Sequence, residues 1–219
     1  MNKRRHLVYS VFPLLLLLTV TAIARQSNPA QQTLRIYLTR HGQTDYNNEG
    51  RIQGWTDVPI NALGRQQAQA LKTHLIGISV DAIYSSNLRR SRETAEIVHG
   101  SVPVTSIEGL NERRFGEFEG VLTNDEYQRR KWIPDDSLGN GESLNAFRER
   151  VRGALDAIRK QHPSGSILIV GHLDTDRMIL SVLLGYSVEQ MKSFQMDNAD
   201  LDLIELGPGD SHRLWKLVP

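Results

Sequence analysis

Two short apolar segments, each running into a histidine, constrain the fold of this chain most strongly. Leu34–Leu38 leads into Arg40-His41-Gly42, and Ile167–Val170 leads into Gly171-His172. Apolar runs of this length, bounded by glycine, are typical of strands. In open α/β sheets, ligands bind at the carboxyl ends of the strands. The sequence therefore predicts two strand ends at which an imidazole, and in one case also a guanidinium, faces a ligand.

Strand-like and helix-like segments alternate along the rest of the chain. We predict helices that open at Asn61–Gly64, cover Ser91–Val98, begin near Ser143 and cover Met178–Leu184. Further strands are predicted at Asp81–Tyr84, Val102–Thr105, Asp200–Leu206 and, as an edge strand, Arg213–Leu217. The clearest helix carries apolar residues at steps of three and four, namely Leu144, Phe147, Val151, Leu155 and Ile158. This alternation predicts an α/β fold with a mainly parallel central sheet and helices on both faces.

The N-terminus differs from the rest of the chain. Residues 1–6 are basic, and Leu7–Ala24 is almost wholly apolar. Ala22-Ile23-Ala24 has the small-x-small pattern of a signal-peptidase cleavage site. This pattern is typical of a secretory signal peptide, cleaved after Ala24. An uncleaved membrane anchor is an alternative, because about 20 apolar residues span a bilayer, and a buried N-terminal helix is another. Residues 25–33 are predicted as a linker and 34–219 as one domain.

The charge and the cysteine content exclude some functions. Without residues 1–24 the chain holds 23 Lys and Arg against 25 Asp and Glu, a net charge of −2. That balance gives no argument for nucleic-acid binding. The chain has no cysteine, so disulfides and thiolate metal sites are excluded. We expect an exported protein, periplasmic or secreted, that meets a membrane only if its N-terminal segment remains as an anchor.

The polar residues near the predicted strand ends suit chemistry on a phosphoryl group. A neutral imidazole, from His41 or His172, can act as a nucleophile near neutral pH. Planar guanidinium groups, at Arg40 and in the Arg89-Arg90 turn, bind two phosphate oxygens each at fixed geometry. Glu112, if its pKa is raised, can protonate a leaving oxygen.

Five motifs resemble, in order, those of the histidine phosphatase superfamily, in its phosphoglycerate-mutase-like branch. They are Leu38–Thr44 with Gln53–Pro59, Tyr84–Ala95, Leu110–Gly116, Gly141–Leu144 and Val170–His172 with Arg177. The resemblance extends from about Leu34 to Leu206. It implies a three-layer α/β sandwich, a phosphorylated small-molecule substrate, and neither a metal ion nor another cofactor.

The resemblance also implies a role for each principal residue. His41 would be the nucleophile that becomes phosphorylated, and Arg40 and Arg90 would hold the phosphate. His172 would donate a hydrogen bond to the phosphate oxygens, and Glu112 would protonate the leaving group.

Further residues are candidates for contacts with the substrate. Arg89 competes with Arg90, but the family spacing Ser-x-Leu-x-Arg selects Arg90. Asn47 and Gln53, followed by Gly54, are predicted to line the phosphate pocket. Arg113 is a candidate contact for the distal part of the substrate.

Some positions leave alternatives open. Leu173 and Asp174 follow the second histidine where the family usually has a glycine and a small or polar residue. They are predicted to add bulk and negative charge beside the pocket, and so to narrow the substrate range or alter the pKa of His172. Trp55 is expected either to cover the pocket mouth or to pack internally. Glu142 is expected either to favour a helix N-terminus or to contact the substrate.

Three functions are consistent with these residues. The first is an exported phosphomonoester hydrolase with a phosphohistidine intermediate that needs no metal. The second is a mutase of the phosphoglycerate type, which returns the phosphate to its substrate. The third is a non-catalytic binder of phosphorylated ligands. The sequence does not select among sugar phosphates, nucleotides, phospholipid head groups and phosphoproteins as ligands.

Overall fold

The computed structural model describes residues 33–98, 102–209 and 211–218. The predicted signal peptide, residues 1–24, and all but the last residue of the predicted linker lie outside this range. Within the described part of the chain, no helix combines the length and the apolar character needed to cross a membrane.

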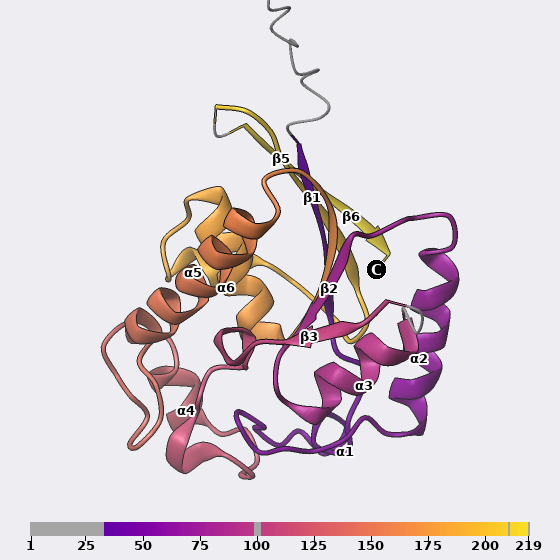
Figure 1. Ribbon diagram of the computed structural model, residues 1–219. Helices are drawn as coiled ribbons and strands as arrows, with labels where there is room; N and C mark the ends of the chain where they lie inside the picture. The colour runs from indigo at the N-terminus through magenta and orange to yellow at the C-terminus, as the bar shows by residue number, and fades with distance from the viewer. Residues whose placement is uncertain (1–32, 99–101, 210, 219) are drawn as a thin grey trace, which may run out of the picture.

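The described residues fold around one six-stranded sheet with the order β3-β2-β4-β1-β5-β6 (Figure 1). The strands are β1 (Leu34–Arg40), β2 (Ala82–Ser85), β3 (Val104–Ser106), β4 (Gly165–Gly171), β5 (Leu201–Leu206) and β6 (His212–Val218). The first four are parallel to one another. β5 is antiparallel to β1, and β6 is antiparallel to β5. The predicted mainly parallel sheet is confirmed, with the antiparallel strands grouped at one edge.

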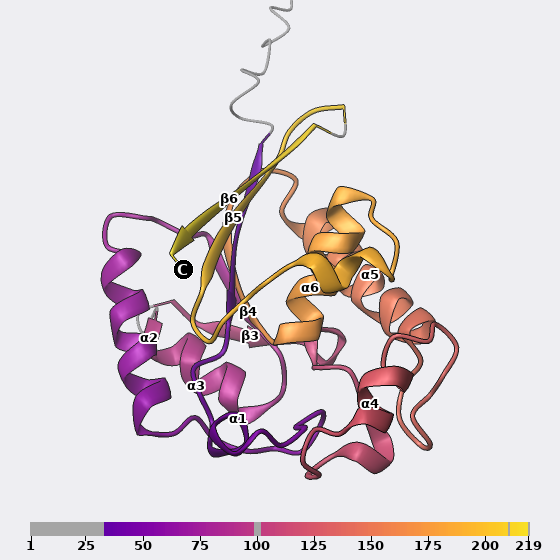
Figure 2. The same cartoon turned by 180° about the vertical axis from the view of Figure 1, so that it is seen from behind.

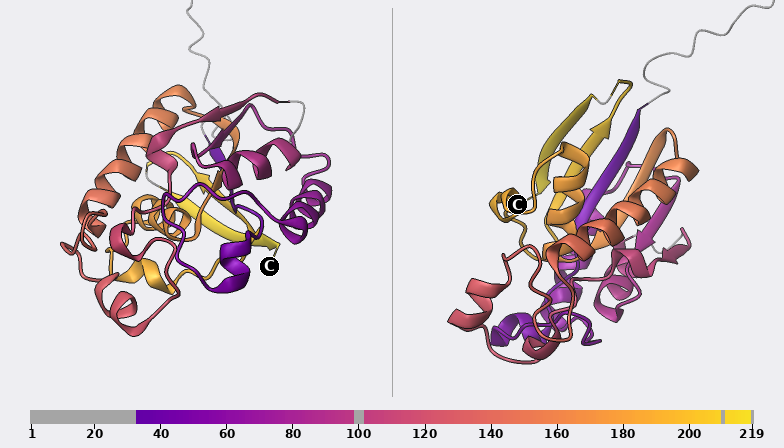
Figure 3. Two further views of the ribbon diagram at one scale, coloured as in Figure 1. Left: turned by 90° about the horizontal axis from the view of Figure 1, so that it is seen from below. Right: turned by 90° about the vertical axis from the view of Figure 1, so that its left-hand side faces the viewer.

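Helices cover both faces of the sheet, which makes the molecule a three-layer sandwich (Figures 1 and 2). The helices are α1 (Asp45–Glu49), α2 (Ala62–His74), α3 (Arg89–Val98), α4 (Asp125–Arg130), α5 (Leu144–Gln161) and α6 (Leu173–Leu184). α2 and α3 lie on one face, and α5 and α6 lie on the other, as the view from below in Figure 3 also shows. The predicted α/β class is therefore confirmed.

Strand β1 shows why the first apolar run is buried on both sides. Successive side chains of a strand point to opposite faces of the sheet. Ile36 and Leu38 pack in the core cluster that contains Phe147 of α5. Tyr37 packs in the opposite cluster with Leu71 of α2. A strand covered by helices on both faces needs apolar residues at nearly every position, and this chain provides them.

Helix α5 begins where the sequence predicts. The hydroxyl of Ser143 accepts a hydrogen bond from the backbone N–H of Ala146, which caps the first turn. The apolar residues predicted as its core stripe are all buried, namely Leu144, Phe147, Val151, Leu155 and Ile158. Arg159 and Lys160 lie in its last turn, where cations offset the helix dipole.

The pairing of β1 with β4 brings the two histidines together. The parallel register pairs Arg40 with Gly171 at the ends of the two strands. The backbone N–H of His41 continues this ladder by donating to the carbonyl of Gly171 at 3.1 Å. His172 is the N-cap of α6. Both imidazoles therefore leave the sheet at the same edge, with ring centroids 5.1 Å apart.

Three helices differ from the sequence prediction. α6 begins at Leu173, five residues before the predicted start at Met178. The prediction was late because the residues at 174–177 are polar, although buried, and so interrupt the apolar pattern in the first turns. α1 and α4 were not predicted. Both are short, mostly polar helices, capped by Thr44 and Asn124 respectively.

The core position of Phe147 gives a test of this fold. Its side chain is fully buried, so Phe147→Ala is expected to lower the free energy of unfolding by about 3–5 kcal/mol. Denaturant titration followed by circular dichroism measures this loss. Ile76, which is 78% exposed, provides the control: Ile76→Ala is expected to cost less than about 0.5 kcal/mol. Equally small losses in both variants would contradict the core assignment of Phe147.

Candidate active site

A cavity of about 250 Å³ lies where β1 ends and extends toward α4. Most of the predicted site residues line it, namely Arg40, His41, Asn47, Gln53, Gly54, Arg90 and Glu112. Of the predicted residues, His172 and Arg113 do not line it. Segments far apart in the sequence thus meet at one site, at the carboxyl end of a central strand, as predicted.

His41 has the protonation state of a nucleophile. Its imidazole is buried, and its Nδ1 lies 2.7 Å from the carbonyl oxygen of Gly42. A carbonyl only accepts, so Nδ1 carries the hydrogen and the neutral ring keeps a lone pair on Nε2. Burial, together with the charges of Arg90 and Arg40, holds the pKa of His41 well below 6.5. The ring is therefore in its neutral form, with one hydrogen on Nδ1, at neutral pH.

Two side chains that the motif analysis did not single out fix the backbone around His41. The Asn198 side chain donates to the carbonyl of His41 at 2.8 Å. The Thr94 hydroxyl accepts from the N–H of Gly42 at 3.0 Å. Gly42 must be glycine, because a Cβ there would lie 2.4 Å from the carbonyl oxygen of Gly64. Asn198 precedes β5 and carries no sequence signal that would have marked it.

Arg90 is a fixed cation with unused donors. Its guanidinium donates to the carbonyl oxygens of Thr56 and Gly54 at 3.0 and 2.8 Å, and to Nδ1 of His172 at 3.2 Å. Because a guanidinium has five N–H groups, two are left for an anion in the cavity. Burial lowers the pKa of Arg90 to about 10, which leaves it charged at neutral pH.

Arg40 provides the second cation. Its Nη1 donates to the carbonyl of Met196 at 3.2 Å, while its buried Nε has no hydrogen-bond partner in the described part of the chain. Burial lowers the pKa of Arg40, and the negative charge of Glu112 opposes that effect. Both guanidinium groups line the cavity together with His41, and the charges of both act on it, so an oxyanion bound there would be neutralised near the imidazole.

His172 lies behind the cavity wall. Its Nδ1 accepts from Nε of Arg90, so its Nε2 carries the hydrogen and donates to the hydroxyl of Ser86 at 2.7 Å. Burial and the charge of Arg90 hold the pKa of His172 well below 6.5. In this arrangement His172 orients Arg90. A direct hydrogen bond from His172 to a phosphate oxygen stays a prediction.

Glu112 has one carboxylate oxygen that can hold a proton. Oε1 accepts three hydrogen bonds, from the N–H of Arg113 at 2.8 Å and from the N–H and hydroxyl of Thr175 at 3.1 and 3.2 Å. Oε2 accepts only one, from the N–H of Asp174 at 3.2 Å. Burial, and next the charge of Asp174, raise the pKa of Glu112. A proton on Oε2 is thus favoured electrostatically and leaves the other contacts intact.

Leu173 and Asp174 both line the cavity, as their position after the second histidine predicted. Burial alone would raise the pKa of Asp174, but the charges of Lys131 and Arg177 outweigh it and lower that pKa. Asp174 is therefore charged, with one oxygen 3.1 Å from Nη1 of Arg177. Its charge raises the pKa of Glu112. The predicted effect of Asp174 on the pKa of His172 stays a prediction.

The placement of Arg113 corrects its predicted role as a substrate contact. Its side chain is fully buried and donates to three backbone carbonyls, those of Glu142 at 2.8 Å, Asp136 at 3.0 Å and Lys131. It therefore clamps the segment between α4 and α5. The sequence could not reveal this role, because Arg113 bonds to backbone carbonyls, which every residue type has.

Asn47 and Gln53 present their amide groups to the cavity. The hydroxyl of Thr44 donates to Oε1 of Gln53 at 3.0 Å, and Oδ1 of Asn47 accepts from the N–H of Thr44 at 3.1 Å in the cap of α1. With the oxygens occupied, the NH₂ groups are the parts that can donate to an anion.

The outer wall of the cavity consists of residues that were not predicted as site residues from the sequence. The lining residues there are Arg51, Ile52, Phe115, Thr123, Tyr127, Gln128 and Lys131. Most of them belong to α4 or to the loops next to it, where no apolar periodicity marks the helix. This wall faces the catalytic candidates and is placed to contact the part of a ligand that lies beyond the phosphate.

Comparison with known proteins agrees with this geometry. The model of the histidine phosphatase superfamily (branch 1) matches residues 36–216. The chain is 33% identical over 172 residues to a Bacillus subtilis protein named "Uncharacterized phosphatase PhoE", covering 78% of this chain and 87% of the relative. It is 31% identical over 182 residues to the "Probable phosphoglycerate mutase GpmB" of Shigella boydii, covering 78% and 85%.

A solved structure shows the same fold. The α-ribazole phosphatase of Shigella flexneri superposes with a TM-score of 0.76 at 30% sequence identity, covering 84% of this chain and 96% of that chain. The family model, the relatives and the fold all agree with the five motifs. The chain belongs to the histidine phosphatase superfamily, in its branch 1.

Proposed function

We propose that the protein hydrolyses small phosphomonoesters through a phosphohistidine on His41, without a metal ion. The observation that carries this proposal is the state of His41. Its Nδ1–H is bonded to a carbonyl, so Nε2 keeps the lone pair, and His41 lines the same cavity as Arg40, Arg90 and Glu112. The cavity of about 250 Å³ suits a small phosphorylated molecule.

In the first step, Nε2 of His41 attacks phosphorus while the bond to the ester oxygen breaks. The new bond is N–P, and the electron pair of the broken bond goes to the leaving oxygen. That oxygen takes the proton from Oε2 of Glu112 and departs as an alcohol. Arg40 and Arg90 neutralise the oxygens that remain on phosphorus.

In the second step, a water molecule attacks phosphorus and the N–P bond breaks. The carboxylate of Glu112 takes a proton from this water, and the electron pair returns to Nε2 of His41. Inorganic phosphate leaves, and both side chains regain their starting protonation states.

A mutase and a non-catalytic binder are the alternatives. Chain length does not separate hydrolase from mutase, because the match covers 85% of the relative named as a mutase. The intact set of nucleophile, cations and acid supports catalysis over simple binding. Release of free phosphate, rather than its return to another position of the substrate, distinguishes hydrolase from mutase.

We also propose export, with cleavage after Ala24. The support is the sequence pattern alone: a basic start, an apolar stretch and the small residues Ala22 and Ala24. Mass spectrometry of the protein recovered from its source cell would give the N-terminal residue.

The first prediction from this mechanism concerns the nucleophile. His41→Ala is expected to lower kcat for 4-nitrophenyl phosphate by at least about a thousandfold, because His41 is the one imidazole among the described residues that line the cavity. Release of free phosphate is measured in EDTA, where the wild-type rate is expected to stay unchanged. A quench in alkali should trap phosphate on His41 of the wild type, since phosphohistidine survives base.

Two results would contradict the mechanism. A rate that disappears with EDTA and returns with a metal ion would show metal-dependent chemistry. A His41→Ala variant with the wild-type rate would show another nucleophile. His74, an exposed histidine on α2, gives the matched control: His74→Ala is expected to retain the wild-type rate.

The second prediction concerns pH. Neutral His41 is needed, so activity falls only when the pH drops through a pKa held well below 6.5. Protonated Glu112 is also needed, so activity falls as the pH rises through its raised pKa. Asp174→Asn removes a charge that raises the Glu112 pKa, and is expected to move the alkaline limb of kcat/KM to lower pH.

The pH profile of kcat/KM for an alkyl phosphate measures this shift, and Asp125→Asn at the exposed start of α4 is the control. An unmoved alkaline limb in Asp174→Asn, or a limb moved to higher pH, would contradict the coupling between the two carboxyl groups.

A further inference from the structure

Glu112 lies in an irregular segment, between a short 3-10 helix at Glu108–Leu110 and another at Gly116–Phe118. No sheet ladder or α-helix holds its backbone, in contrast to His41 at the end of β1. The N–H groups at the start of α6 fix its carboxyl group. The position of its main chain must be set by other groups.

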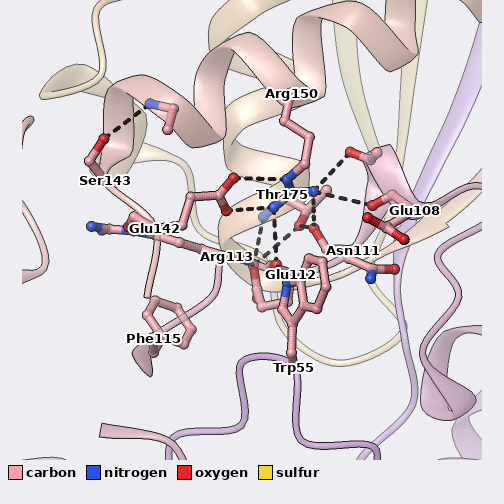
Figure 4. A network of polar contacts seen from close by, with 12 residues as sticks. Trp55, Glu108, Asn111, Glu112, Arg113, Phe115, Glu142, Ser143, Arg150 and Thr175 are labelled. Carbon is pink, nitrogen blue, oxygen red and sulfur yellow. Dashed lines mark hydrogen bonds and ion pairs between the residues drawn. The ribbon is translucent and has the colours of Figure 1, made fainter. Parts of the chain in front are cut away.

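One side chain makes most of those contacts. Arg150, from the second turn of α5, donates to the carbonyl oxygens of four residues that lead up to and include Glu112 (Figure 4). Nη1 lies 3.3 Å from the carbonyl oxygen of Glu108, 3.1 Å from that of Gly109 and 3.0 Å from that of Asn111, so its two N–H groups are shared among three acceptors. Nη2 donates to the carbonyl of Glu112 at 3.2 Å. A single guanidinium thus attaches the segment from Glu108 to Glu112 to α5 through hydrogen bonds.

The guanidinium of Arg150 is itself held in place. Glu142 accepts from Nε of Arg150 at 2.9 Å and from Nη2 at 2.7 Å, as the paired dashed lines in Figure 4 show. Both side chains are largely buried, with exposures of 19% and 14%, so this is a fixed bidentate pair. Glu142 does not line the cavity. Its carboxylate pairs with Arg150, a role beyond the favourable charge near a helix N-terminus that its position predicted.

Trp55 completes the arrangement. Its Nε1–H donates to the carbonyl of Glu112 at 2.7 Å, so this carbonyl accepts from both Trp55 and Arg150. The indole ring also lies 5.8 Å from the guanidinium carbon of Arg150. Two roles were expected for Trp55, covering the pocket mouth or packing internally. These contacts agree with internal packing.

We infer that Arg150, held by Glu142, is a positioning residue for Glu112: it fixes the backbone from which the proton donor reaches the leaving group. The inference rests on the proposed function, in which Glu112 is that donor. A misplacement of about 1 Å in a catalytic group can cost about a hundredfold in rate. The carbonyl contacts of Arg150 all lie on the segment that carries Glu112. We therefore expect Arg150 to affect protonation of the leaving group, through Glu112, and not binding of the phosphate.

The leaving group separates this role from a merely structural one. Glycerol 3-phosphate expels an alkoxide that needs a proton, whereas 4-nitrophenyl phosphate expels a stable phenolate. In Arg150→Lys, a single ammonium cannot pair bidentately with Glu142 and also reach four carbonyls. We expect kcat/KM for glycerol 3-phosphate to fall about tenfold to hundredfold, and its ratio to the value for 4-nitrophenyl phosphate to fall by nearly the same factor.

Three further variants make the test specific. Trp55→Phe keeps a ring but removes one N–H donor, and is expected to lower the same ratio by a smaller factor. On a Glu112→Gln background, Arg150→Lys is expected to cause no further loss with glycerol 3-phosphate, because the donor it positions is already absent. Arg152→Lys, on an exposed arginine of the same helix, is the matched control and is expected to leave the ratio unchanged.

Other outcomes would overturn the inference. Equal losses for both substrates in Arg150→Lys, with an unchanged ratio in Trp55→Phe, would show a general structural role. A further loss on the Glu112→Gln background would show that Arg150 acts independently of Glu112. If the wild type hydrolyses neither substrate, the proposed function fails first and the inference fails with it, which separates that result from a failure of Arg150 alone.

Discussion

The parallel pairing of β1 with β4 is the constraint on which the site depends. Its register ends with Arg40 opposite Gly171, so the residues that follow, His41 and His172, leave the sheet side by side. A slip of one residue would turn every side chain of β1 to the opposite face. It would bury Tyr37 among the residues of α5 and α6. The core on both faces of the sheet therefore fixes the position of the imidazoles as firmly as any contact within the site.

Burial then sets the charge states that the proposed chemistry needs. Removal from water disfavours the charged form of any titratable group. It lowers the pKa of His41 and raises that of Glu112, so the same physical effect favours the neutral form of both groups. Arginine resists this effect because its pKa starts so high: even lowered to about 10, Arg90 stays charged. The site thus combines neutral reacting groups with permanent cations.

The sequence predicted what depends on periodicity and on local motifs. The buried strands, the apolar stripe of α5 and the residues around His41 and Arg90 follow from apolar spacing and turn residues. The short helix α4 was missed because it has no apolar stripe, and with it the outer wall of the cavity. Arg113 was misjudged because a buried arginine that donates to carbonyls looks the same in sequence as a surface one. The start of α6 was placed late because its buried polar residues break the apolar pattern.

The two halves of the site are built differently, and this has a functional consequence. The phosphate half stands on the ends of β1 and β4, which hold Arg40 and His41, and on α3, which carries Arg90. The leaving-group half stands on the Glu112 segment and the loops around α4, which depend on side-chain contacts such as those of Arg150. Changes in the second half can alter which alcohol is released without disturbing phosphate binding. If the proposed reaction holds, we therefore expect the substrate preference of this protein to depend on the part of the site with the least regular secondary structure.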